Sequence, residues 1–139
     1  MILGFDPGRD KCGVAVMGPD NRLHYHQVLL TEEVPSTITG LCQQFAVDRL
    51  AIGDQTTSKF WRENLTDILP KSVAIVTVNE RNSTLEARDR YWQMYPPRGI
   101  LRLIPVKMRM PPRPIDDIVA ILLIERYLGV HPNFDIAKN

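Results

Sequence analysis

Three acidic residues that lie far apart in the sequence have the types and positions needed to bind metal ions together. Asp6 directly follows a short apolar run, and Glu80 follows a second, β-branched run. Asp116 stands at the start of the last long apolar segment. Carboxylates that gather in one place repel one another, so such a cluster is costly without a cation. Hard oxygen ligands suit Mg²⁺ or Mn²⁺, and a pair of such ions can promote cleavage of a phosphodiester bond.

Asp54 and Asp117 are further candidates for the same site. Each acid also has a structural interpretation. An aspartate before Pro-Gly can start a turn, Asp54 can act as a capping residue, and Glu80 can be a solvated loop charge. Acids at a helix start, such as Asp116 and Asp117, are stabilised by the helix dipole. The combination points to a site more strongly than any single residue does.

The hydrophobic pattern predicts an α/β fold that could bring these acids together. Apolar runs predict strands over 2–5, 13–17, 22–30, 49–53 and 72–78. Helical spacing predicts helices over 38–45, 58–69, 83–95 and 115–128. The order β-β-β-α-β-α-β-α-loop-α predicts a mixed five-stranded sheet, with the first strand central and helices on both faces. The carboxyl ends of its parallel strands would then carry the acids.

Three local features refine this prediction. The continuous run 72–78 is typical of a strand buried on both faces. Ser83 and Glu86 have the spacing of a capping box, with Ser83 as N-cap. Residues 96–114 are rich in proline and are predicted to form a loop with an extended part over 100–105.

Composition indicates one domain over residues 1–139 with an ordinary core, since 44% of the residues are hydrophobic. The two cysteines lack C-x-x-C spacing, no basic leader precedes the first strand, and no apolar run approaches a membrane span. We therefore expect a cytoplasmic protein with free thiols and no membrane partner. His24, His26 and His131 have no ligand spacing and are interpreted as structural.

The motifs resemble those of the YqgF type of Holliday-junction-resolvase-like nucleases, which have the RNase H-like fold. The matching residues are Asp6-Pro-Gly with Gly-Val-Ala-Val at 13–16, Asn79-Glu80-Arg81 with Ser-Thr-Leu-Glu-Ala at 83–87, and the segment from Asp116 to Tyr127-Leu128. The resemblance covers nearly the whole chain. It implies a Mg²⁺- or Mn²⁺-dependent nuclease, with two ions, acting on structured nucleic acid such as a Holliday junction or a ribosomal RNA precursor.

The resemblance also implies that Asp6, Glu80 and Asp116 are catalytic and bind the metal, with Asp6 bridging the ions. The sequence departs from the family pattern in two places. Asn79 replaces an acid, and Gly53-Asp54-Gln55 resembles the acid-Gln of RuvC-type resolvases rather than the usual Gly-Leu-Pro. The choice between Asp54 and Glu80 as second metal ligand is therefore left open.

Basic residues provide the expected surface for nucleic acid, because they outnumber acids between residues 81 and 113. Tyr91, Trp92 and Tyr95 are interleaved and could stack on unpaired bases, although inward packing explains Trp92 and Tyr95 better. The candidate phosphate-binding residues are Arg9, Lys11, Arg81, Arg88, Arg98, Arg102, Lys107, Arg109 and Arg113.

Two other functions compete with a nuclease. Actin-like or sugar-kinase ATPases also open with an Asp-x-Gly hairpin, but they need two such domains, so this chain would be a fragment of one. A non-catalytic nucleic-acid-binding or scaffold domain of the same fold is the second alternative. Cleavage assays with Mn²⁺ would separate it from an enzyme. The sequence leaves open DNA or RNA as the substrate, and whether the chain forms a homodimer.

Overall fold

The computed structural model describes residues 1–55 and 57–129. Its strands are β1 (Ile2–Asp6), β2 (Lys11–Met17), β3 (Leu23–Leu30), β4 (Arg49–Gly53) and β5 (Ala74–Val78). They form one mixed sheet in the order β3-β2-β1-β4-β5, so β1 is central, as the sequence predicts. β2 lies antiparallel to β1 and β3, whereas β1, β4 and β5 are parallel. Parallel pairing brings the carboxyl ends of β1, β4 and β5 to one edge.

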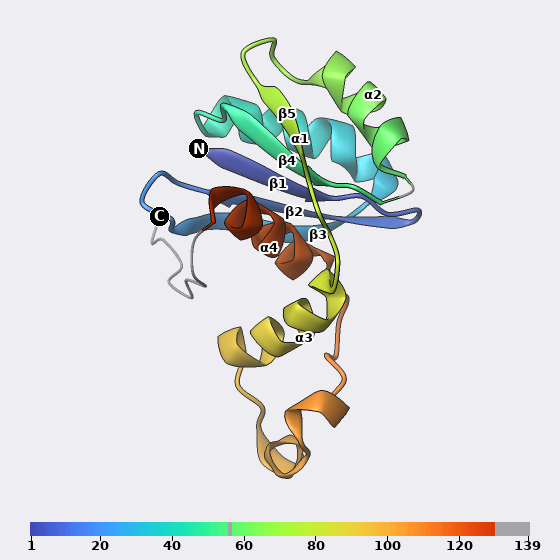
Figure 1. Cartoon of the computed structure of the whole chain (residues 1–139), viewed down its shortest axis with the longest axis vertical. Helices are drawn as coiled ribbons and strands as arrows, with labels where there is room; N and C mark the ends of the chain where they lie inside the picture. Colours follow the sequence, from blue (N-terminus) through green and yellow to red (C-terminus); the bar gives the residue numbers. More distant parts are fainter. Residues whose placement is uncertain (56, 130–139) are drawn as a thin grey trace.

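Helices cover both faces of the sheet (Figure 1). They are α1 (Val34–Gln44), α2 (Ser58–Ile68), α3 (Ser83–Met94) and α4 (Asp116–Leu128), with short 3₁₀ turns η1 (Thr31–Glu33), η2 (Gly99–Leu103) and η3 (Val106–Met108). Side chains alternate across a strand. Leu3 and Phe5 of β1 therefore pack into the core under α1 and α2, and Gly4 faces α4. Asp6 falls on the α4 face for the same reason.

Helix α4 lies very close to the sheet because glycines face it. A Cβ atom on Gly4 would collide with the backbone oxygen of Ala120, and one on Gly13 would collide with the backbone of Asp116. Glycine inside a strand is typical of such close approach. Gly13 is also the partner of Asp6 in the β1–β2 register. The first turn of α4 is therefore seated beside the end of β1.

A buried ion pair holds α3 against α4. Arg90 and Glu125 are both buried, and an Arg90 Nη atom donates to a carboxylate oxygen of Glu125 at 3.1 Å. Removing one partner of such a pair leaves a buried charge without compensation, which costs about 3–5 kcal/mol.

Within residues 1–55 and 57–129, no helix combines the length and the apolar character needed to cross a membrane.

The prediction for β5 is wrong in one respect. β5 is an edge strand with Ala74 and Thr77 exposed, not a strand buried on both faces. The chain leaves the sheet after Val78 and runs toward α3 (Figure 1). No described strand pairs with the outer edge of β5. A β-branched run reports strand propensity and does not fix the strand's place in the sheet.

Two further local predictions are also wrong. Helix α3 begins at Ser83 with Asn82 as its N-cap, at φ 62°, so Ser83 does not cap it. The side chain of Glu86 instead contacts Arg126 at 3.1 Å, a tertiary ion pair that competes with the local capping box. Residues 100–105 are largely in 3₁₀ conformation rather than extended.

We predict opposite effects for alanine at two glycines. Gly4→Ala should lower the free energy of unfolding by about 1–3 kcal/mol, because the new methyl group overlaps α4. Gly40 lies inside α1, and a Cβ atom there would meet nothing within 4 Å. Gly40→Ala should therefore raise the free energy of unfolding by about 0.5–1 kcal/mol. Urea denaturation measures both values, and similar effects at the two sites would contradict the close packing of α4.

Candidate active site

The three acids predicted from the sequence converge at the carboxyl edge of the sheet. Asp6 ends β1, Glu80 follows β5, and Asp116 is the first residue of α4. The side chain of Asp6 hydrogen-bonds to Glu80 and also to Asp116. Asp6 is therefore the central member of the cluster. Its two partners lie far from it in the sequence, Glu80 by 74 positions and Asp116 by 110.

Glu80 reaches Asp6 because Gly53, at the end of β4, has no side chain. The carboxyl group of Glu80 occupies the place that a Cβ atom on Gly53 would take. The backbone N–H of Glu80 donates to Oδ1 of Asp54 at 3.1 Å. Asp54 is exposed; this hydrogen bond fixes the turn that carries Glu80, and, after burial, the charge of Asp54 contributes to the raised pKa of Glu80.

Asp117 is held away from the cluster by a separate set of contacts. His26 Nδ1 lies 2.6 Å from Oδ2 of Asp117, and Arg113 donates to both carboxylate oxygens at 2.9 and 3.2 Å. Asp117 is only 2% exposed. These contacts anchor the first turn of α4, which also carries Asp116. The sequence predicts a structural role for His26 but not its partner, because Asp117 lies 91 positions away and meets His26 only where β3 contacts α4.

Burial raises the pKa values of all three acids in the cluster, and at Asp6 repulsion from the other two adds to it. Burial, followed by the charges of Glu80 and Asp116, raises the pKa of Asp6 to about 9. Burial also raises the pKa values of Glu80 and Asp116. At Asp117 burial acts in the same direction, but hydrogen bonds from His26 and Arg113 outweigh it and lower the pKa. The pKa values of these adjacent aspartates are therefore shifted in opposite directions, and Asp117 is ionised at neutral pH.

The oxygen atoms of the cluster fit a hard divalent cation. Glu80 is 3% exposed, and its buried Oε1 has no hydrogen-bond partner among the residues that the structure describes. Buried polar atoms normally have a partner, so this oxygen has an unused ligand position. Carboxylates are also the ligands that Mg²⁺ and Mn²⁺ prefer. However, no three His, Cys, Asp or Glu side chains among residues 1–55 and 57–129 form a ready-made metal site. In this structure the acids contact one another instead.

Most of the predicted phosphate-binding residues are accessible. Arg9, Lys11, Arg81, Arg98, Arg102 and Lys107 are exposed, and Arg88 is partly exposed. Arg109 and Arg113 are committed elsewhere: Arg109 donates to backbone carbonyls of residues 101, 102 and 104, and Arg113 binds Asp117. Trp92 is buried, whereas Tyr95 is 38% exposed.

Two other sequence features have structural explanations. Asn79, which replaces an acid of the family pattern, accepts a hydrogen bond from the backbone N–H of Arg81 at 2.7 Å and shapes the turn after Glu80. His24 packs beside Phe45, with ring centroids 5.9 Å apart. His131 lies outside the described residues.

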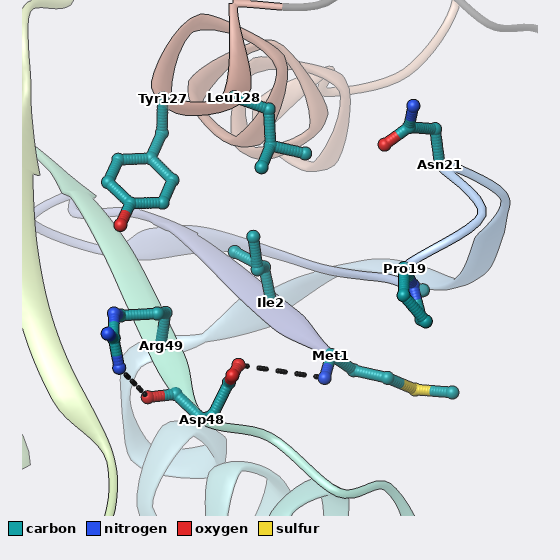
Figure 2. A pocket seen from close by; sticks show the side chains of 9 residues that line it. Met1, Ile2, Pro19, Asn21, Asp48, Arg49, Tyr127 and Leu128 are labelled. Atoms are coloured by element: carbon teal, nitrogen blue, oxygen red, sulfur yellow. Dashed lines mark hydrogen bonds and ion pairs between the residues drawn. The ribbon is translucent and has the colours of Figure 1, made fainter.

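A pocket of about 330 Å³ lies at the other end of the strands from the acid cluster (Figure 2). It is lined by residues around the amino ends of β1 and β4 and by Tyr127 and Leu128 of α4. The Met1 ammonium group approaches Asp48 at 3.6 Å and donates to the carbonyl of Ala46 at 2.8 Å. None of the predicted site residues lines this pocket, so the chemistry of the acids is not located there.

Comparison with known proteins identifies the fold. The chain resembles Thermus thermophilus RuvC in complex with a Holliday junction substrate, with a TM-score of 0.52, 16% identity and 88% of each chain covered. A second Thermus thermophilus RuvC structure matches with a TM-score of 0.52, 14% identity and the same coverage. No family model and no curated protein matches the sequence. The chain therefore has the RNase H-like fold of RuvC, and at this identity the similarity shows the fold alone.

The raised pKa of Asp6 predicts that the metal-free protein loses stability as the pH rises. An aspartate in the unfolded chain titrates at about 3.9, whereas folded Asp6 keeps its proton up to about pH 9. Between these values the native state binds more protons than the unfolded state, so the free energy of unfolding falls with rising pH. Glu80 and Asp116 act in the same direction.

Thermal melts in EDTA between about pH 5 and pH 8 test this linkage. The melting temperature of the wild type should fall steadily across the range. Asp6→Asn removes the central titrating group and should flatten the profile, leaving the variant at least as stable at the upper end. Parallel profiles for the two proteins would show that Asp6 is an ordinary turn residue.

Proposed function

We propose that this protein is a metal-dependent nuclease that hydrolyses phosphodiester bonds in structured nucleic acid. The observation that carries the proposal is the contact of Asp6 with both Glu80 and Asp116 at the carboxyl edge of the sheet. The buried, unpartnered Oε1 of Glu80 supports it, because this oxygen is free to bind a cation. The likeness in fold to RuvC in complex with a Holliday junction substrate adds support from a second direction.

Asp6, Glu80 and Asp116 would hold Mg²⁺ or Mn²⁺, with Asp6 as the shared ligand because it contacts the other two. Such ions supply charge stabilisation and an activated water in phosphodiester hydrolysis. The protein's own contribution is positioning. Gly53 and Asp54 fix Glu80, and the contacts of Asp117 fix the turn that carries Asp116. Because Asp6 retains its proton when metal is absent, metal binding at this site requires proton release.

The sequence motifs favour the YqgF type within this class, with a cytoplasmic location and either a Holliday junction or a ribosomal RNA precursor as substrate. The competing function is a non-catalytic nucleic-acid-binding domain. Two observations favour it: the described part of the chain contains no ready-made metal site, and Asn79 stands in place of an acid. Both proposals share the basic surface, so only cleavage separates them.

We predict that Asp6→Asn abolishes cleavage but leaves binding. Turnover with Mn²⁺ should fall by orders of magnitude, because the shared metal ligand is lost, while affinity for the nucleic acid in EDTA stays within about twofold. The assay uses four-way DNA junctions, flaps, duplexes and structured RNA, each with labelled ends. Thermal melts provide a second readout: at about ten times its dissociation constant, one ion should add roughly 1.4 kcal/mol to the wild type and less to the variant. Equal activity in the two proteins would contradict the assignment.

A second prediction concerns phosphate contacts. Arg98→Ala and Lys107→Ala should each reduce the slope of log affinity against log salt by about 0.7–0.9, the value for one lost phosphate contact. Lys71→Ala is the matched control, because Lys71 is also exposed but precedes β5 at the opposite edge of the sheet. Salt titrations of binding give the slopes. If Lys71→Ala changes the slope and the other two do not, the nucleic acid lies on a different surface.

A further inference from the structure

Residues 96–114, here called the arm, connect α3 to α4 and project away from the sheet (Figure 1). The arm is inserted between two of the candidate catalytic acids, because α3 follows Glu80 and α4 begins at Asp116. It contains the four most exposed large hydrophobic side chains of the described residues: Ile100 (80%), Leu103 (86%), Met108 (72%) and Met110 (67%). An exposed group of this kind marks an interaction site.

The side chain of Arg109, rather than packing of apolar side chains, stabilises the conformation of the arm. Arg109 Nε donates to the carbonyls of Leu101 and Ile104 at 2.9 and 2.7 Å, and its Nη2 donates to the carbonyl of Arg102 at 3.3 Å. The guanidinium group of Arg109 also lies over the buried ring of Trp92, with 5.9 Å from its carbon to the ring centroid. These contacts tie η2 to the following segment and to α3. The aliphatic side chains of η2 are left facing outward.

Ile100 and Leu103 form a short apolar ridge on this frame. Both belong to η2, and side chains three residues apart in a 3₁₀ helix lie on the same side. The ridge is flanked by exposed cations, Arg98, Arg102 and Lys107. No acidic residue occurs between Asp89 and Asp116. The arm therefore presents the apolar ridge within a segment whose charged residues are all cations. Such a surface is complementary to a polyanion that also has apolar surface.

We propose that the arm is a wedge that recognises interrupted base stacking in nucleic acid. Leu103 and Ile100 enter the gap at a branch point or between unpaired bases, while Arg98, Arg102 and Lys107 bind the flanking phosphates. Apolar side chains are inserted between bases in this way where stacking can be opened, and a continuous duplex offers no such gap without the cost of unstacking. The inference rests on the proposed function, because it assumes a nucleic-acid substrate, and it specifies branched or locally unpaired structures as the substrate class.

Two features favour nucleic acid over an anionic membrane surface. The apolar ridge spans a single short 3₁₀ turn, whereas membrane-surface helices have a long apolar face. The arm also ends at the first turn of α4, which carries Asp116, so the arm and one acid of the cluster lie on adjacent segments of the chain.

The test compares Leu103→Ser with Leu85→Ser, because Leu85 is an exposed leucine on α3 outside the arm. Both changes are made in the Asp6→Asn protein, and binding is measured in EDTA, so that cleavage does not interfere. The probes are a four-way DNA junction with 2-aminopurine at its branch point and a continuous duplex of the same sequence. Circular dichroism and thermal melts confirm that the variants are folded.

We expect the parent to bind the junction more tightly than the duplex and to raise the 2-aminopurine fluorescence by unstacking it. Leu103→Ser should lose about tenfold in junction affinity, as expected for withdrawing a buried leucine, and should lose the fluorescence change. Its duplex affinity should stay within about twofold, because its phosphate contacts remain. Leu85→Ser should behave like the parent.

Several results would overturn the inference. They are equal affinity of the parent for junction and duplex, equal behaviour of the two leucine variants, and equal losses by Leu103→Ser on both probes. Leu103-dependent binding to anionic phospholipid vesicles or Leu103-dependent self-association, without the junction effect, would assign the arm to a membrane or to a second copy. Cleavage by the wild type with Mn²⁺ is scored separately. Cleavage without junction discrimination would reject only the wedge, and discrimination without cleavage would reject only the nuclease.

Discussion

The candidate site depends on one constraint, which is the close packing of α4 against the central strands. Gly4 and Gly13 let the helix backbone contact the sheet, and the buried contacts of Asp117 fix its first turn. Asp116 is therefore placed beside Asp6 and cannot move away to relieve the repulsion between the two carboxyl groups. Burial of Asp6, followed by this repulsion, raises its pKa to about 9, so Asp6 keeps its proton at neutral pH when no metal is bound.

The two aspartates at the start of α4 show how differently one sequence motif can be used. Asp116 belongs to the cluster and burial raises its pKa, whereas Asp117, one position further along, contacts His26 and Arg113, which lower its pKa. One is available to a cation, and the other stabilises the helix end that presents its neighbour. Asp54 and Glu80 have a similar relationship, since the first binds the backbone of the second. Glu80 and Asp116 thus each have a neighbouring acid whose contacts hold their backbone in place.

The sequence predicted the parts of the fold that depend on hydrophobic period and chain order. The central place of β1 and the convergence of Asp6 with Glu80 follow from parallel pairing, which period and connectivity determine. Asp116 is brought to them by the close contact of α4 with Gly13. The missed features depend on distant partners. Glu86 has the spacing of a capping residue but pairs with Arg126, forty positions away. His26 has no motif around it and acquires its role only when β3 meets α4.

The glycines that make room for Glu80 and for the backbone of α4 could help to recognise related sequences. The fold matches at 14–16% identity, a level at which acids are easily misaligned because Asp and Glu can exchange while still carrying a carboxylate. A side chain at Gly13 would collide with the α4 backbone, and one at Gly53 would displace the Glu80 carboxyl group from its place in the cluster. A glycine ending the fourth strand and one at the third position of the second strand are therefore stricter markers of this arrangement than the acids are. A divergent sequence with all the acids but a larger residue at either position would have to build the site differently.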